Sequence, residues 1–187
     1  DILFTKNFDT LICFPSKHPF STYKIPKSVT SIANSAFSRC SHLKSIDVES
    51  ENLNYVSKDG ILFTKNFEVL IRFPSNHRFT TYTIPASVTS IADFAFSECR
   101  NIQSITIPPS VTSIGNSAFS RCDNLKSIDV ESENLNYVSI DGILFTKNFE
   151  VLICFPSKHR FSTYTIPTSV TSIGDSAFYN CTNLESI

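Results

Sequence analysis

The sequence predicts a repeat solenoid of mixed α/β class, rich in β-structure, in which each repeat adds a strand and a short helix to a stacked array. Two motifs predict it: one of 23 residues occurs three times complete and a fourth time one residue shorter, and one of 36 residues alternates with it. Apolar residues fall at the same positions in every copy. Self-similarity with a period of about 20–50 residues is typical of stacked arrays, because a single repeat cannot bury its apolar face alone.

The two motifs divide residues 1–187 into one solenoid without a separate domain. Each repeat contacts mainly its neighbours, so we expect the core to extend along one axis. The short units occupy 25–47, 84–106, 107–129 and 166–187. The long units occupy 48–83 and 130–165, and 1–24 is a partial long unit. Because the chain begins and ends inside a unit, we expect a fragment of a longer protein whose targeting signal lies elsewhere.

In the short unit, Ser104-Ile105-Thr106-Ile107 alternates polar and β-branched residues, which predicts a strand with its isoleucines facing inward. Proline cannot donate to a strand ladder, so Pro108 ends this strand. Residues 110–114 predict a second extended segment on another side of the coil. A short helix is predicted next, because a good N-cap residue precedes an apolar face at helical spacing. The N-cap residues of the four copies are Asn34, Asp93, Asn116 and Asp175.

Stacking places like residues over one another, so the phenylalanine of each short unit is expected to join a continuous internal column. This column comprises Phe37, Phe96, Phe119 and Phe178. Four cysteines follow these phenylalanines at a fixed interval, and Cys13 and Cys154 share a second position that Arg72 fills in the middle copy. Cysteine is often fully buried, so we expect a ladder of buried thiols, with paired disulfides as the alternative. The four of the ladder are Cys40, Cys99, Cys122 and Cys181.

In the long unit, residues 54–73 predict a two- or three-stranded β-meander in place of the helix. Asp59-Gly60 is a tight-turn signal, and two apolar runs flank the polar break at Lys65-Asn66. Pro74 ends the meander, and a basic loop leads to the next array strand at 82–84. The phenylalanines of this unit recur at matching positions in the other long units, which indicates a packing role.

Composition and motifs point away from several classes of protein. The formal net charge of −1 and the 18% of charged residues produce no long-range field for nucleic acid or anionic lipid. No stretch approaches the roughly 18–20 apolar residues that span a bilayer. The sequence has no GxSxG, glycine-rich phosphate loop or HExxH motif, and no CxxC pair or histidine spacing suited to zinc. We therefore expect no enzyme activity, metal or cofactor.

Two sets of residues are candidates for binding. If the array strands line a concave sheet, side chains alternating with the buried residues form a hydroxyl-rich face, although serine and threonine also favour exposed strands without a binding role. This face comprises Thr22, Lys24, Ser45, Asp47, Thr81, Thr83, Ser104, Thr106, Ser127, Asp129, Thr163 and Thr165. Basic loops before three array strands could contact sulfated glycans or acidic proteins, or could carry ordinary solvated charge. They contain Lys17, His18, His77, Arg78, Lys158, His159 and Arg160.

The short-unit pattern IPxSVTSIxxSAFxxCxxLxSI resembles the BspA-like, or Treponema pallidum type, leucine-rich repeat, and the long unit resembles a variant insert of that family. The resemblance covers essentially the whole chain, although isoleucine largely replaces leucine and the asparagine ladder of commoner leucine-rich repeats is missing. It implies a curved, right-handed solenoid without catalytic residues. Similar proteins are surface proteins of oral and anaerobic bacteria, Trichomonas and Entamoeba, implicated in attachment.

The resemblance leads us to expect a cell-surface or extracellular adhesion module. Its concave face would recognise a protein or glycan, such as host matrix, another host surface or another microbe. An intracellular scaffold or regulatory module with the same fold is the alternative. We expect no nucleic-acid partner and no membrane insertion of this fragment. Apolar ends without capping repeats could also let copies of the fragment associate.

Overall fold

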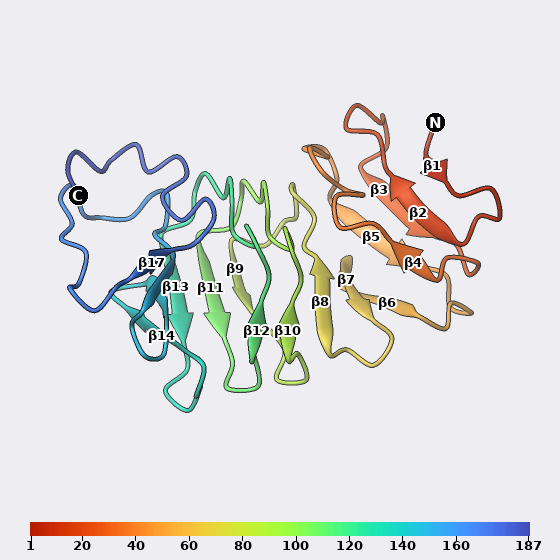
Figure 1. Cartoon of the computed structure of the whole chain (residues 1–187). Helices are drawn as coiled ribbons and strands as arrows, with labels where there is room; N and C mark the ends of the chain where they lie inside the picture. The colour runs from red at the N-terminus through yellow and green to blue at the C-terminus, as the bar shows by residue number, and fades with distance from the viewer.

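Seventeen short strands and no helix make up the chain, and the computed structural model describes all residues, 1–187. The strands wind into an elongated coil whose N-terminal and C-terminal strands lie at opposite ends (Figure 1). No helix long and apolar enough to cross a bilayer is present. The repeat period thus produces a β-solenoid, and the predicted α/β class is wrong in its helical part.

One wall of the coil consists of the predicted array strands, all parallel. They are β3 (Thr22–Ile25), β5 (Ser45–Val48), β9 (Thr81–Thr83), β11 (Ser104–Ile107) and β13 (Ser127–Val130). β3 pairs with β5, and β11 pairs with both β9 and β13. Like residues lie side by side: Ile105 is level with Ile128 and Tyr82, and both isoleucines are buried. The prediction of strands with inward isoleucines is confirmed, except that the last copy keeps only a bridge between Thr163 and Ser186.

A second wall consists of three four-residue strands and four two-residue strands, and the two-residue strands come from the predicted second extended segment. Within the wall β2 pairs with β4, β10 pairs with β8 and β12, and β16 pairs with β17, all in parallel, so corresponding residues lie level within each group. These strands are β2 (Thr10–Cys13), β4 (Ser31–Ile32), β8 (Val69–Arg72), β10 (Ser90–Ile91), β12 (Ser113–Ile114), β16 (Val151–Cys154) and β17 (Ser172–Ile173).

The predicted helix is replaced in each short unit by consecutive turns, which form a third wall. Left-handed residues interrupt the segment, for example Ser117 with φ 51° and Arg121 with φ 58°. Where two short units are adjacent, N–H groups of the first segment bond to the next coil: the Phe96 N–H donates to the Ala118 carbonyl at 2.8 Å. A helix this short would gain few internal bonds, whereas stacking satisfies these donors between copies. The expected N-caps Asn34, Asp93, Asn116 and Asp175 therefore begin no helix.

Each long unit contains a three-stranded antiparallel meander, as predicted. Asp59 and Gly60 turn the chain between β6 and β7, and the Gly60 carbonyl accepts a bond from the Ile46 N–H of the first wall at 2.8 Å. Gly60 has φ +78°, and a Cβ there would lie 2.5 Å from Ser45 Oγ, so glycine is required. The meanders are β6 (Tyr55–Lys58), β7 (Ile61–Thr64) and β8, then β14 (Tyr137–Ile140), β15 (Ile143–Thr146) and β16, with β1 (Leu3–Phe4) and β2 as the partial copy.

The middle strands of the meanders divide the core into three compartments. Leu62 of β7 packs with the N-terminal cluster, whereas Ile61 and Phe63 pack with the central cluster. On β15, Leu144 faces the central cluster, and its neighbours Ile143 and Phe145 face the C-terminal cluster. Successive side chains point to opposite faces of a strand, so a strand buried on both faces forms a partition.

The phenylalanine column is correspondingly not continuous, and that prediction is wrong. The long units contribute Phe14, Phe73 and Phe155, and the rings form three separate groups, of which Phe14–Phe37 is tilted and the other two are stacked. Ring centroids are 6.1 Å apart for Phe14–Phe37, 5.2 Å for Phe73–Phe96, 5.6 Å for Phe96–Phe119 and 5.3 Å for Phe155–Phe178. Each group belongs to one compartment.

The cysteines are free thiols, and the predicted ladder is buried at three of its four positions. Cys122 donates to the Phe96 carbonyl at 3.0 Å, and the other ladder cysteines make matching bonds to the preceding coil. Burial raises the pKa of Cys40 to about 11. Of the second cysteine position, Cys154 is buried and Cys13 is exposed.

Candidate functional site

The side chains expected on the sheet face lie in register on two patches of the first wall. Thr22 is level with Ser45 and Lys24 with Asp47 on β3 and β5. The second patch, on β9, β11 and β13, carries one row of Thr81, Ser104 and Ser127 and another row of Thr83, Thr106 and Asp129. All of these side chains are exposed or half-buried. Thr163 and Thr165 are also exposed but belong to no strand.

At the start of β13, this sheet face meets a basic loop in a polar hollow of about 470 Å³, which we call the C-terminal hollow. An equivalent hollow of similar volume, the central hollow, lies one copy earlier at the start of β5. The C-terminal hollow is lined by Lys126, Ser127, Asp129, Ser139, Asp141, Gly142, Lys158, His159 and Arg160. The central hollow is lined by Lys44, Ser45, Asp59, Asn76, His77, Arg78 and Asn101. The structure therefore brings together parts of the two candidate sets.

Buried histidines hold the loops of both hollows in place. The His159 ring bonds to the Asp141 carbonyl at 2.8 Å through Nε2 and accepts the Phe161 N–H at Nδ1. This pairing fits a neutral ring that donates from Nε2. His77 makes the same bonds to Asp59 and Phe79, and burial lowers the pKa of His77. These two histidines anchor the loops, which leaves the arginines and lysines as the accessible cations.

In the N-terminal partial unit, the basic loop has no such hollow. Lys17 is exposed, and the half-buried His18 ring packs between Phe14 at 4.7 Å and Phe20 at 5.1 Å. Lys17 and His18 are thus separated from the two hollows.

The C-terminal hollow combines three cations with two carboxylates. Arg160 pairs with Asp141 at 2.7 Å and lies 5.1 Å from the Phe161 ring centroid. Its side chain is still 71% exposed, so its remaining donors can reach a ligand. Ser127 Oγ donates to Asp129 at 3.1 Å, which leaves hydroxyl and carboxylate oxygens beside the cations. Such a surface can bind a polar or anionic ligand through charge-assisted hydrogen bonds.

The central hollow is built in the same way with fewer charges. Arg78 lies 5.3 Å from the Phe79 ring centroid, and Ser45 Oγ donates to Asp47 at 2.9 Å. Lys44 and Asp59 complete its charged groups. The residues that sequence reasoning missed in the two hollows are Lys44, Asp59, Asn101, Lys126, Ser139, Asp141 and Gly142, whereas Asn76 belongs to the predicted loop with His77 and Arg78. The near-identity of 45–71 and 127–153 could have shown that whatever surrounds Ser45 also surrounds Ser127.

No group of three or more histidine, cysteine, aspartate or glutamate side chains could hold a metal ion. The histidine rings of the hollows are occupied by backbone partners, and no serine or cysteine lies within hydrogen-bond distance of them. The arrangement therefore offers hydrogen-bond donors, acceptors and fixed charges.

A family model for the BspA type leucine rich repeat region matches the chain in six copies, over residues 11–71, 72–151 and 152–187. A leucine rich cell surface protein from Faecalibacterium prausnitzii shares 30% identity, with a TM-score of 0.65 over 90% of this chain and 47% of that one. The pneumococcal vaccine antigen PcpA shares 22% identity, with a TM-score of 0.62 over 82% of this chain and 35% of that one. A leucine-rich repeat protein from Eubacterium ventriosum shares 24%, with a TM-score of 0.56 over 86% and 58%.

The similarities to PcpA and to the Eubacterium ventriosum protein concern the fold alone. This chain spans between about a third and somewhat over half of the length of each of the three proteins. No curated protein sequence matches the chain.

Proposed function

Because this chain belongs to the BspA-type leucine-rich repeat family, typically a non-catalytic binding scaffold, we propose that it is the binding module of a surface adhesin. Its partner is a protein or glycan of a host or of another microbe. The observation that carries the proposal is the repeated polar hollow, in which an accessible arginine meets the hydroxyl-rich sheet face. The relative at 30% identity is a leucine rich cell surface protein, which supports a surface location for this chain.

Chemistry favours a ligand that carries both anionic and hydroxyl groups. Arg160 and Lys158 supply donors for carboxylate or sulfate oxygens, and Asp129 and Ser127 accept bonds from hydroxyl groups. One shallow hollow would bind weakly. A ligand that reaches both hollows gains from effective concentration, which can raise avidity by about 10²–10⁴ without any new contact.

The test is a binding screen of the chain against matrix proteins and a panel of sulfated, carboxylated and neutral glycans. Arg78→Glu and Arg160→Glu test the hollows, and Thr106→Lys with Asp129→Lys tests the sheet face. Lys147→Glu is the matched control, because Lys147 is an exposed cation outside both hollows. The proposal requires a ligand whose affinity falls in the hollow or face variants and is unchanged in the control. A screen without a ligand, or equal losses in all variants, would overturn it.

An intracellular interaction module is the second candidate, and the six free thiols favour it, since secreted chains more often carry disulfides. Protease treatment of intact cells separates the two locations. Digestion of the protein on intact cells supports the adhesin. Full protection, with the protein found inside the cells, supports the intracellular module.

A further inference from the structure

The turn wall is incomplete where a long unit separates two short units, because the long unit carries a meander in place of the turn segment. The first gap lies between the turns around Asn34 and Asp93, whose side chains bond to each other at 3.0 Å. The second gap lies between the turns around Asn116 and Asp175, 82 residues further along. The sequences around the two gaps are nearly the same, so a few side chains decide whether each gap is occupied or left as a cavity.

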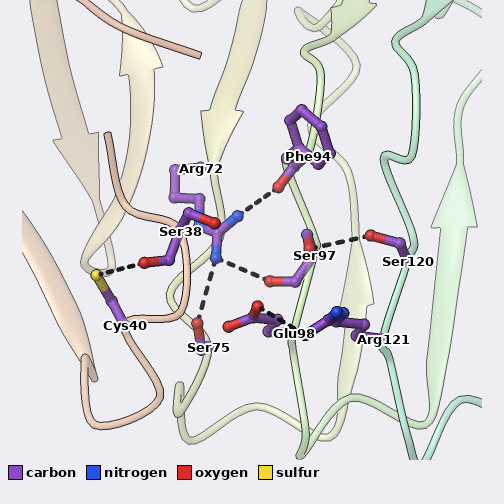
Figure 2. A network of polar contacts seen from close by, with 9 residues as sticks. All are labelled: Ser38, Cys40, Arg72, Ser75, Phe94, Ser97, Glu98, Ser120 and Arg121. Carbon is purple, nitrogen blue, oxygen red and sulfur yellow. Dashed lines mark hydrogen bonds and ion pairs between the residues drawn. The ribbon is translucent and has the colours of Figure 1, made fainter. Parts of the chain in front are cut away.

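Arg72 fills the first gap. The residue is only 5% exposed, and its guanidinium donates to the Phe94 carbonyl, to the Ser97 carbonyl at 2.8 Å and to Ser75 Oγ at 3.3 Å (Figure 2). No carboxylate lies within ion-pair distance of Arg72. The gap is thus a site in which backbone carbonyl and hydroxyl oxygens receive a planar cation.

The second gap has Cys154 at the position of Arg72, and a cavity of about 170 Å³ remains there. Buried Ala118, Phe119 and Cys154 form its inner part, and exposed Asn116, Asp175 and Ser176 form its mouth. Cys154 is 6% exposed, and its thiol makes no hydrogen bond. The cavity therefore has an apolar interior and an oxygen-rich mouth.

The walls of the two gaps correspond in part. Of the residues that accept bonds from Arg72, Phe94 has a counterpart in the cavity wall, whereas Tyr179 and Ser157, the counterparts of Ser97 and Ser75, do not line the cavity. Ser176 stands where Phe94 presents its carbonyl to Arg72, and Asp175 stands where Asp93 does. Asn116 makes no side-chain bond to Asp175, whereas their counterparts close the mouth of the first gap. The nearby cation, Arg121, is engaged elsewhere: it pairs with Glu98 at 3.7 Å and lies 5.3 Å from the Tyr179 ring centroid.

We propose that the cavity at Cys154 binds a guanidinium group, supplied by an arginine side chain of a partner protein. The methylene stem would contact Phe119 and Ala118, and the planar fork would donate to oxygens of Ser176 and Asp175. The site belongs to the turn wall, so it is separate from the hollows of the sheet face. A partner could engage both walls at once.

The test is an NMR titration of the whole 187-residue chain with methylguanidinium at millimolar concentration. In the unmodified chain we expect one saturable set of shifts, at the amides of Ser117, Gly174 and Ser176. Cys154→Arg fills the cavity with a resident side chain, so these shifts should vanish and the melting temperature should rise. Arg72→Cys opens the first gap, so a second saturable set should appear at Phe94 and Ser97.

Methylammonium is the matched control, because it has the same charge without the planar fork, and it should bind about tenfold more weakly. Nα-acetylarginine methylamide should bind better than free arginine if the natural source is a polypeptide; the reverse order would identify a free metabolite and overturn the assignment to a partner. Unsaturable shifts that persist in Cys154→Arg would also overturn the proposal. If Arg72→Cys does not fold, the comparison of the unmodified chain with Cys154→Arg still decides it.

Discussion

Removing the central ring of the longest phenylalanine stack tests how the core is divided. Phe96 is fully buried, with Phe73 and Phe119 stacked on either side at 5.2 and 5.6 Å. Truncation of a buried phenylalanine to alanine costs about 3–5 kcal/mol, because transfer energy is lost and a cavity remains. Rings on both sides limit collapse of that cavity, so we expect Phe96→Ala to lose about 4–5 kcal/mol of unfolding free energy.

Phe178→Ala is the matched comparison, because Phe178 occupies the same repeat position with less burial. It is half-buried and stacks on one ring, Phe155, at 5.3 Å. We therefore expect a loss of about 2–3 kcal/mol. At about 2–4 °C per kcal/mol for a chain of this size, Phe96→Ala should melt some 10–15 °C lower and Phe178→Ala about 5–10 °C lower.

Urea unfolding followed by far-ultraviolet circular dichroism and tyrosine fluorescence measures both losses, since the chain has no tryptophan. Repeat arrays can unfold in parts, so amide hydrogen exchange should accompany the melts. Because β7 and β15 separate the compartments, protection should fall first in the central one for Phe96→Ala and in the C-terminal one for Phe178→Ala. Equal losses from the two substitutions, with the same pattern of exchange, would refute the division of the core.

Three further predictions concern buried polar groups. Asn52 is fully buried and makes four hydrogen bonds, so Asn52→Ala should cost about 2–4 kcal/mol in urea unfolding, whereas Asn66→Ala, at an exposed site, should cost less than about 1 kcal/mol. Burial lowers the pKa of His77 below 6.5, so the unfolded chain binds the proton more readily. Stability from neutral His77 is therefore present above about pH 6.5 and lost as pH falls, and melting temperatures of His77→Gln should depend less on pH. A thiol reagent should label Cys13 fastest and half-buried Cys181 more slowly in the native chain, and all six cysteines after unfolding; fast native labelling of Cys40, Cys99 or Cys122 would contradict their burial.

The local period of the sequence determined the array, its units and much of its register. Alternation at Ser104–Ile107 predicted an inward-facing Ile105, and equal spacing predicted that Ile105 lies level with Ile128. The Asp59-Gly60 turn signal predicted the meander. The structure shows why glycine occupies position 60: its φ is left-handed, and a Cβ there would lie 2.5 Å from Ser45 Oγ. These features depend on residues close in sequence or one repeat apart, and both distances can be read from the chain.

Only the tertiary structure decided the features that depend on a neighbouring coil. The segment after Asn116 has helical spacing, but its carbonyls accept bonds from N–H groups of the preceding coil, so turns replace the helix. Leu62 and Phe63 look alike in sequence, but the crossing of β7 places them in different compartments.

The candidate site shows the same limit. The sequence predicted the basic loop and the sheet face as separate candidates. It did not predict that they line one hollow, because this depends on the Asp141-Gly142 turn lying between the loop and Ser127. His159 reads as a surface charge in the sequence, yet it is buried by bonds to a turn 18 residues earlier. Hydrogen-bond partners and burial come from the adjacent coil, and the period alone does not specify which groups of that coil face the site.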